Sequence, residues 1–351
     1  MHILVATDAW HPQVNGVVRS LTMMAEAAKG FGVEVGFLTP QSFRTFALPS
    51  YRDVRVALPY QAKIARLIRE ARPDSIHIAT EGPIGLLARR YCRKHGLAFT
   101  TSFHTRFPDY ISARLPIRES WIWAALRAFH RPSQAVMAAT PALASELRGR
   151  GFGNVVLWPR GVDTKLFHPR SVDLGLPRPV FLCVGRVAVE KNLEAFLDLD
   201  LPGTKLIVGD GPALMELTRK YPNAVFVGAR QGEALAEAYA AADVFVFPSK
   251  TDTFGLVLLE ALASGLPVAA FPVTGPRDVI GNAPVGVLND DLRLACLSAL
   301  HISPQACLEF AAKHTWEASA RAFVENIANI RKVGPAGETM EFTAETPRFV
   351  A

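Results

Sequence analysis

Two kinds of hydrophobic pattern take turns along this chain. Short apolar runs that suit strands are separated by longer stretches whose apolar residues recur every three or four positions, as on one face of a helix. In the first half, the strand-like runs are residues 2–7, 33–38, 54–58, 75–79, 98–102, 135–139 and 154–158. The helix-like stretches between them include residues 17–29, 60–72, 84–95 and 141–149. Such alternation predicts βαβ units around a parallel sheet.

The alternation begins again after a proline-rich break. Residues 168–179 contain three prolines and predict a linker. The strand-like runs beyond it are residues 180–185, 204–208, 224–228, 243–247 and 267–271, and two helices are expected at 305–313 and 316–331. We therefore predict an α/β protein with two doubly wound parallel sheets, one in residues 1–167 and one in residues 180–332. The last helix is expected to pack back on the first domain, and residues 333–351 to form a loose tail.

Composition agrees with two well-filled cores. The chain has 351 residues, of which 50% are apolar and 20% charged, which suits two globular domains. Its four cysteines are far apart in the sequence and predict reduced core thiols, without disulfides or zinc. The first residues lack the basic segment of a signal peptide, and no uncharged apolar stretch approaches 18 residues. We therefore expect a cytoplasmic protein.

The net charge of +6 is unevenly spread. Residues 1–168 hold 22 lysines and arginines against 11 acids, whereas the remainder holds 16 against 21. A basic half joined to an acidic half favours a face that meets an anionic partner. A solubilising surface without any partner is the simpler alternative.

The strongest chemical signal is the segment 249–270, SKTDTFGLVLLEALASGLPVAA. A predicted strand ends just before it, and a helix is expected to begin near Phe254 or Gly255. Asp252 precedes this helix and Glu260 lies on it. A helix carboxylate can accept two hydrogen bonds from a vicinal diol such as a ribose, a loop carboxylate can bind sugar hydroxyls, and the helix N-terminus attracts phosphate. The alternative is a capping aspartate and an ordinary helix glutamate.

A second signal follows the strand at 180–185. Arg186 and Lys191 lie five residues apart in VGRVAVEKN, at the carboxyl end of this strand. Two cations at such a position can hold a diphosphate, because arginine binds phosphate in a bidentate way and lysine acts as a point charge. Ordinary surface cations remain the alternative.

Weaker signals lie at the ends of other strands. Gly16 follows Asn15 at the start of a predicted helix, and Gly209 and Gly211 belong to the turn VGDGP. His104 follows the strand at 98–102. Glycine turns and a single histidine are as often structural as functional, so these residues are candidates only by their position.

Together these motifs resemble those of retaining glycosyltransferase family 4, which has the GT-B fold of two Rossmann-like domains facing across a cleft. That family carries E-x7-E followed by A-x-A-x-G-x-P-V. Residues 260–268, EALASGLPV, match its second part, and Asp252 stands where the family has its first glutamate. The resemblance spans nearly the whole chain and is nearest to bacterial glycosyl-diacylglycerol synthases and related α-mannosyltransferases.

The resemblance implies a role for each motif. Glu260 would bind the donor ribose and Asp252 the donor sugar, while His104 would approach that sugar from the N-terminal domain. The residues implied as catalytic are Arg186, Lys191, Asp252 and His104. The residues implied as donor-binding are Gly16, Gly185, Arg186, Lys191, Gly209, Gly211, Val227, Gly228, Asp252, Phe254, Gly255, Leu256 and Glu260. No metal and no cofactor is implied, because the nucleotide sugar is a substrate.

The acceptor side is expected in the basic half. On the predicted helix 60–72, the cations occupy the face opposite the apolar one: Lys63, Arg66, Arg69 and Arg72. This face either is solvated or lies on anionic lipid. The resemblance implies a lipid acceptor such as diacylglycerol, and hence a glycolipid-synthesising protein, peripheral on the inner face of the plasma membrane.

Three other functions remain open at this stage. A GDP-mannose-dependent α-mannosyltransferase would use a soluble or polyprenyl-linked acceptor, and a nucleotide-sugar epimerase of the same fold would need no acceptor. A nucleic-acid binder would use the basic half, but the residues expected in the cleft argue against it, so no nucleic acid partner is expected. The base of the donor, uracil or guanine, is also left open.

Overall fold

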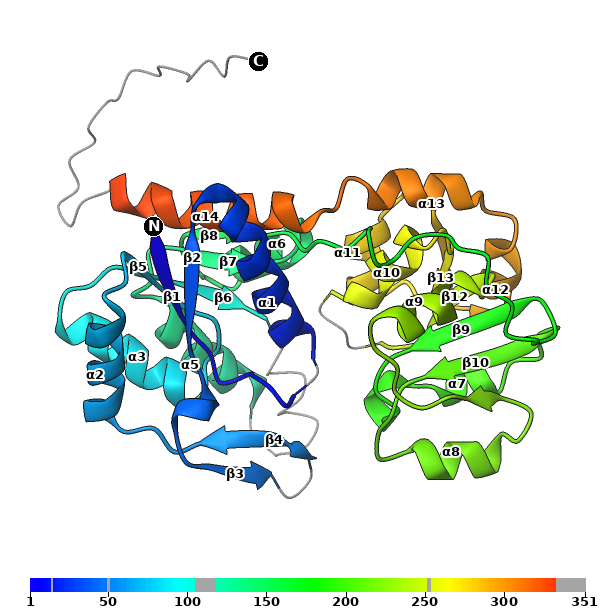
Figure 1. Cartoon of the computed structure of the whole chain (residues 1–351), viewed down its shortest axis with the longest axis horizontal. Coiled ribbons are helices and arrows are strands. Elements are labelled where there is room, and N and C mark those ends of the chain that lie inside the picture. The colour runs from blue at the N-terminus through cyan, green and yellow to red at the C-terminus, as the bar shows by residue number, and fades with distance from the viewer. Residues whose placement is uncertain (14, 49–50, 105–117, 251–253, 333–351) are drawn as a thin grey trace, which may run out of the picture.

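The computed structural model describes residues 1–13, 15–48, 51–104, 118–250 and 254–332. It has two six-stranded parallel sheets with helices around them (Figure 1). Buried apolar side chains pack around both sheets, which is the layering expected of doubly wound domains. This arrangement confirms the predicted fold class.

The first sheet lies between residues 2 and 157. Its strand order is β2-β1-β5-β6-β7-β8, with β1 His2–Ala6, β2 Glu34–Leu38, β5 Ser75–Ile78, β6 Phe99–Phe103, β7 Val136–Ala138 and β8 Val155–Leu157. Its helices include α1 Gly16–Ala28, α2 Gln61–Ala71, α3 Pro83–Lys94, α5 Glu119–His130 and α6 Pro141–Gly149. These elements confirm the predicted alternation.

The prediction for residues 54–58 was wrong in its pairing. They belong to β4, Tyr51–Ala57, which pairs antiparallel with β3, Thr45–Leu48, in a separate two-stranded sheet. In the second part of this strand Arg55 stands between Val54 and Val56, an alternation typical of an antiparallel strand with one solvated face. A strand buried on both faces would be almost continuously apolar.

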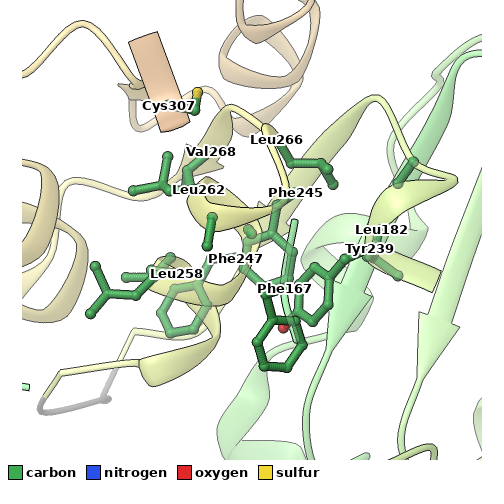
Figure 2. Close-up of a cluster of buried hydrophobic side chains, with 14 of the residues drawn as sticks. Phe167, Leu182, Tyr239, Phe245, Phe247, Leu258, Leu262, Leu266, Val268 and Cys307 are labelled. Carbon is green, nitrogen blue, oxygen red and sulfur yellow. The ribbon is translucent and has the colours of Figure 1, made fainter. Parts of the chain in front are cut away.

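The second sheet lies between residues 180 and 288. Its order is β11-β10-β9-β12-β13-β14, with β9 Val180–Val184, β10 Thr204–Val208, β11 Val225–Phe226, β12 Val244–Phe247, β13 Val268–Ala270 and β14 Gly286–Leu288. Its helices include α7 Glu194–Leu197, α8 Leu214–Lys220, α9 Glu233–Ala240, α10 Leu256–Ala263, α11 Thr274–Ile280, α12 Leu292–Ala299 and α13 Pro304–Ala311. The short edge strand β14 was not predicted. Figure 2 shows the core beneath α10, where Phe167, Tyr239 and Phe245 meet.

The chain passes between the two sheets twice. At the crossing, Val162 forms an isolated parallel bridge with Thr315. A Cβ added at Gly161 would lie 2.4 Å from the Trp316 nitrogen, so the two passages touch backbone to backbone. Beyond the second passage, α14, Trp316–Lys332, lies along the N-terminal half and packs against α1 (Figure 1).

Candidate functional site

The predicted cations lie at the point where the second sheet changes direction. From β9 the chain builds outward through β10 and β11, and it then returns to place β12 on the other side of β9. Ligands of such sheets bind beside the carboxyl ends of these two central strands. Arg186 and Lys191 follow β9 and are partly buried. Asn192, with a left-handed φ of 52°, donates to the Pro248 carbonyl at 3.0 Å and ties this loop to the end of β12.

The glycines of this region are required by close backbone packing. A Cβ at Gly209 would lie 1.8 Å from the Gly185 carbonyl oxygen, and one at Gly211 would lie 2.4 Å from that of Val187. The amide of Gly185 donates to the Val208 carbonyl at 3.0 Å. The loops after β9 and β10 are therefore one packed unit, in which Gly209 and Gly211 hold the cation-bearing loop. The space beside Gly185 is open, since a Cβ there would meet nothing within 4 Å.

Glu260 is held from two sides in a nearly closed environment. Its side chain is only 4% exposed, and Oε1 lies 2.8 Å from Nη1 of Arg19, which belongs to α1 of the other domain. Its Oε2 accepts from the hydroxyl of Tyr239 on α9 at 3.0 Å. Burial raises the pKa of Glu260, while the Arg19 charge and the Tyr239 hydrogen bond oppose this rise. The carboxylate thus faces the N-terminal domain, as a group that binds a ligand in the cleft would.

Arg19 and Tyr239 were missed at the sequence level. Arg19 lies three residues after Gly16 on the same helix, so it shares the face of α1 that approaches α10. Tyr239 sits in an alanine-rich helix and reads as an ordinary core residue. The only available signal was that spacing from Gly16, because the partner of Arg19 lies in the other domain.

The first turns of α1 and α10 meet across the domains. Gly255 begins α10 with a left-handed φ of 81°, and a Cβ at Gly16 would contact Leu256 at 3.8 Å. Asn15 caps α1 by accepting from the amides of Val17 and Val18, both at 3.0 Å. These two amides are therefore occupied, which leaves less of this helix N-terminus for phosphate than the sequence predicted.

His104 lies in a buried hydrogen-bond network at the end of β6. Its Nδ1 is 3.2 Å from Nη2 of Arg160, and its Nε2 is 2.8 Å from the Ser102 hydroxyl. Arginine can only donate, so Nδ1 accepts and the proton sits on Nε2. Burial, then Arg160 and His77, hold the pKa of His104 well below its ordinary value. Both ring nitrogens of His104 thus have hydrogen-bond partners inside the protein.

The remaining predicted residues divide into three groups. Asp252 lies outside the described residues. Phe254 is partly buried and packs on the core beneath α10. The Val227 amide donates to Ile207 and the Gly228 carbonyl accepts from Gly209, so both groups take part in hydrogen bonds at the end of the sheet.

Only part of the basic face of α2 is exposed to solvent. Lys63 is partly buried, donates to the Ser42 carbonyl and lies 5.1 Å from the centre of the Phe43 ring. Arg66, Arg69 and Arg72 are exposed. Lys63 therefore belongs to the packing of the domain, and three cations remain of the predicted face.

The described part of the chain holds neither a metal-ligand cluster nor a membrane-spanning helix. No three His, Cys, Asp or Glu side chains gather there closely enough to hold a metal ion, and no helix there is long and apolar enough to cross a bilayer. The four cysteines form no disulfide and are buried, which agrees with the core thiols that the sequence predicted.

Comparison with known proteins fits this geometry. Residues 14–166 match Glycosyltransferase Family 4, and residues 178–299 match Glycosyl transferases group 1. Over 315 residues the chain is 33% identical to a GDP-mannose-dependent alpha-mannosyltransferase of Mycobacterium tuberculosis, with 82% of this chain and 83% of that protein covered. This chain is a family 4 glycosyltransferase.

Other similarities agree with the assignment to family 4. The chain is 28% identical over 374 residues to an alpha-monoglucosyldiacylglycerol synthase of Streptococcus pneumoniae, with 93% of this chain and 84% of that protein covered. Its fold matches a sucrose-phosphate synthase of Thermosynechococcus elongatus with a TM-score of 0.75 at 22% identity, over 94% of this chain and 99% of that one. This family 4 enzyme therefore has the GT-B fold and uses a nucleotide sugar as its donor.

Proposed function

We propose that this enzyme transfers a hexose, with retention of configuration, from a UDP- or GDP-sugar to a lipid acceptor such as diacylglycerol at an anionic membrane surface. The donor would lie along the carboxyl ends of β9 and β12. There Arg186 and Lys191 would hold its diphosphate and Glu260 its ribose, with Asp252 contacting the sugar. This placement is supported by the switch point of the second sheet and by the closed carboxylate of Glu260.

The proposed reaction needs no covalent enzyme intermediate. The bond between the sugar C1 and the β-phosphate oxygen breaks, and the acceptor hydroxyl oxygen forms the new bond on the same face of the sugar. The departing phosphate takes the acceptor proton. Arg186 and Lys191 would stabilise the charge that develops on the leaving diphosphate, and a neutral His104 would line the sugar side of the cleft without transferring a proton.

The observation that carries the lipid acceptor is a set of exposed apolar side chains around the carboxyl edge of the first sheet. Leu86 and Trp121 lie in the first turns of α3 and α5, the helices that follow β5 and β6. Gln61 donates to the Leu87 carbonyl at 3.4 Å and so brings the start of α2 to the start of α3. The exposed fractions are 45% for Phe46, 58% for Leu58, 60% for Tyr60, 49% for Leu86 and 68% for Trp121.

Cations accompany these apolar side chains. Arg44 lies opposite Leu58 in the hairpin, because the Leu58 amide donates to its carbonyl at 2.8 Å. Arg118 precedes α5, and Arg66 and Arg69 are exposed on α2. Large apolar side chains mixed with exposed cations are typical of a protein face that lies in a lipid headgroup layer. Each cation near such a surface contributes about 1 kcal/mol of attraction.

One alternative donor has support of its own. The Mycobacterium tuberculosis relative is named for GDP-mannose, so transfer of mannose is the second candidate. A GDP-mannose donor is compatible with the lipid acceptor proposed here, whereas a soluble acceptor is not. Donor base and acceptor class are therefore tested separately.

The deciding experiment measures transfer from UDP-glucose, UDP-galactose and GDP-mannose, with diacylglycerol in phosphatidylglycerol vesicles or with soluble sugars as acceptors. We expect one donor to label the lipid, and flotation to show binding that falls as salt rises. Leu58→Asp combined with Trp121→Asp should lower vesicle binding at least about tenfold, while Leu294→Asp, an exposed position of the other domain, should not. Transfer to soluble sugars alone, with no vesicle binding, would exclude the lipid acceptor.

A further inference from the structure

The ion pair between Arg19 and Glu260 joins the two domains at the donor side of the cleft. Nη1 of Arg19 and Oε1 of Glu260 are 2.8 Å apart. The guanidinium also lies 5.3 Å from the centre of the Phe167 ring, which packs edge-to-face on Tyr239 (Figure 2). The Arg19 side chain is 36% exposed and that of Glu260 is 4% exposed. A hydrated cation of one domain thus meets a buried carboxylate of the other.

Glu260 depends on this partner to stay ionised. Among the residues that the structure describes, the titratable groups that act on it are Arg19 on α1 and Tyr239 on α9, with Cys183 of β9 next to Tyr239. Among them, Arg19 is the source of positive charge, and Tyr239 is neutral because burial and the neighbouring carboxylate raise its pKa. A buried carboxylate without a cation takes up a proton rather than remain charged.

Arg19 and Tyr239 also determine which lone pairs of the Glu260 carboxylate remain available to a ligand. Each carboxylate oxygen has two lone-pair directions. Arg19 occupies one on Oε1 and Tyr239 occupies one on Oε2. One direction on each oxygen is left, and a vicinal diol such as the 2′,3′-hydroxyls of a ribose needs two neighbouring acceptors.

We infer that Arg19 is a positioning residue for the donor: it reaches across the cleft to orient and charge the carboxylate that holds the ribose. This inference rests on the proposed role of Glu260.

The test compares ribose and deoxyribose ligands. Calorimetry would give the Kd of UDP and GDP, and of their 2′,3′-dideoxy analogues, for the wild type, Arg19→Met and Arg19→Lys. Lys29→Met is the matched control, because Lys29 lies at the end of the same helix and pairs with Glu26 on the surface at 2.5 Å. The variants are then compared with whichever of UDP and GDP binds the wild type more tightly, together with its dideoxy analogue.

We expect Arg19→Met to weaken binding of the ribonucleotide about tenfold or more, since a protonated Glu260 no longer offers charge-assisted hydrogen bonds to both ribose hydroxyls. The dideoxy analogue should be little affected. The loss should grow as the pH falls from 8 to 6, because the unpaired Glu260 becomes protonated. Arg19→Lys should recover part of the affinity, and Lys29→Met should behave as the wild type.

Each other outcome has a defined meaning. Equal weakening for both nucleotides, unchanged binding, or tighter binding in Arg19→Met would overturn the positioning role. If Glu260→Gln binds the ribonucleotide as the wild type does, the proposed role of Glu260 itself fails. If Glu260→Gln loses affinity while Arg19→Met keeps it, the inference alone fails. Should Arg19→Met not fold, the affinity ratio and pH profile of Arg19→Lys decide, because a lysine cannot reproduce the same reach and geometry.

Discussion

Buried polar side chains at the end of the first sheet are held by one another. His77 is fully buried on β5, with Nδ1 2.8 Å from the Thr100 hydroxyl and Nε2 3.0 Å from that of Ser102. Burial, then the charges of Arg160 and His130, lowers the pKa of His77 to about 3. The imidazole is therefore neutral in the folded protein throughout the neutral range, and it links the two strands by hydrogen bonds alone.

This neutral histidine makes the stability dependent on pH. The unfolded chain protonates His77 near its ordinary pKa of 6.5, whereas the folded chain does so only near 3, so the free energy of unfolding falls as the pH drops through this window. The contribution is about 1.4 kcal/mol by pH 5.5. Urea unfolding at pH 7.5 and 5.5 should show a smaller pH-dependent loss in His77→Gln than in the wild type. His301→Gln, at an exposed position, should keep the full loss; equal slopes in all three would contradict the prediction.

The residues of the candidate site differ in how readily the sequence alone identifies them. Arg186, Lys191 and Glu260 could be found because each follows a predicted strand in a motif with ordered spacing. Arg19 could not, because its importance depends on which helix of the other domain it meets. The engagement of both nitrogens of His104 also depends on Arg160, which lies far along the chain and reaches it only in the folded sheet.

At the scale of elements, the loops after β9 and β10 act as one support for the proposed donor site. The amide of Val187 donates to the Asp210 carbonyl at 2.9 Å, and its own carbonyl accepts from Ala213 at 3.0 Å. Gly211 fits beside Val187 because it has no side chain. Arg186 lies between Gly185 and Val187, so the packing of the two loops fixes the position of its backbone.

Gly211→Ala should therefore destabilise the C-terminal domain. The added Cβ would lie 2.4 Å from the Val187 carbonyl oxygen, and the expected loss is about 3 kcal/mol or more. Gly149→Ala is the control, because a Cβ there meets nothing within 4 Å and the residue ends α6; its free energy of unfolding should be unchanged or slightly raised. Chemical denaturation followed by far-UV circular dichroism measures both, and equal stability of the two variants would show that the loops can move apart.

Elements with strong periodicity were predicted well, whereas the short strands β3 and β14 were not predicted. Helices such as α2 and α3 keep an apolar stripe over three turns, which the sequence displays directly. β3 and β14 are short strands, and each forms only by pairing with the strand beside it, β4 and β13 respectively. The pairing of β4 was predicted wrongly because the sequence reports that a strand forms more reliably than which strand it will adjoin.

At the scale of the whole molecule, the last helix belongs to the first domain. The Trp158 indole donates to the Ser319 hydroxyl at 3.1 Å, and the ring of Phe323 packs on Trp158 and His77 with centroid distances of 4.8 and 5.0 Å. Phe323 is fully buried. The core of the N-terminal domain is therefore completed by residues more than 300 positions along the chain.

Phe323→Ala should consequently destabilise the N-terminal domain, although the residue follows the C-terminal one in sequence. A fully buried phenylalanine changed to alanine costs about 3–5 kcal/mol. Hydrogen exchange read by mass spectrometry should show faster exchange in β1, β5 and α1, with β9 and β12 unchanged. Glu325→Ala, exposed on the same helix, should leave both domains as they are. Faster exchange confined to residues 180–288 would contradict this assignment.

The double passage between the domains has a practical consequence for dividing the enzyme. A break within residues 168–179 would yield one fragment with the first sheet and a second fragment with the other sheet followed by α14. Because α14 of the second fragment packs Phe323 and Ser319 against Trp158 of the first, this contact should bring the two fragments together again. Co-expressed halves cut there should recombine into an active enzyme, whereas halves cut so that α14 is lost should not.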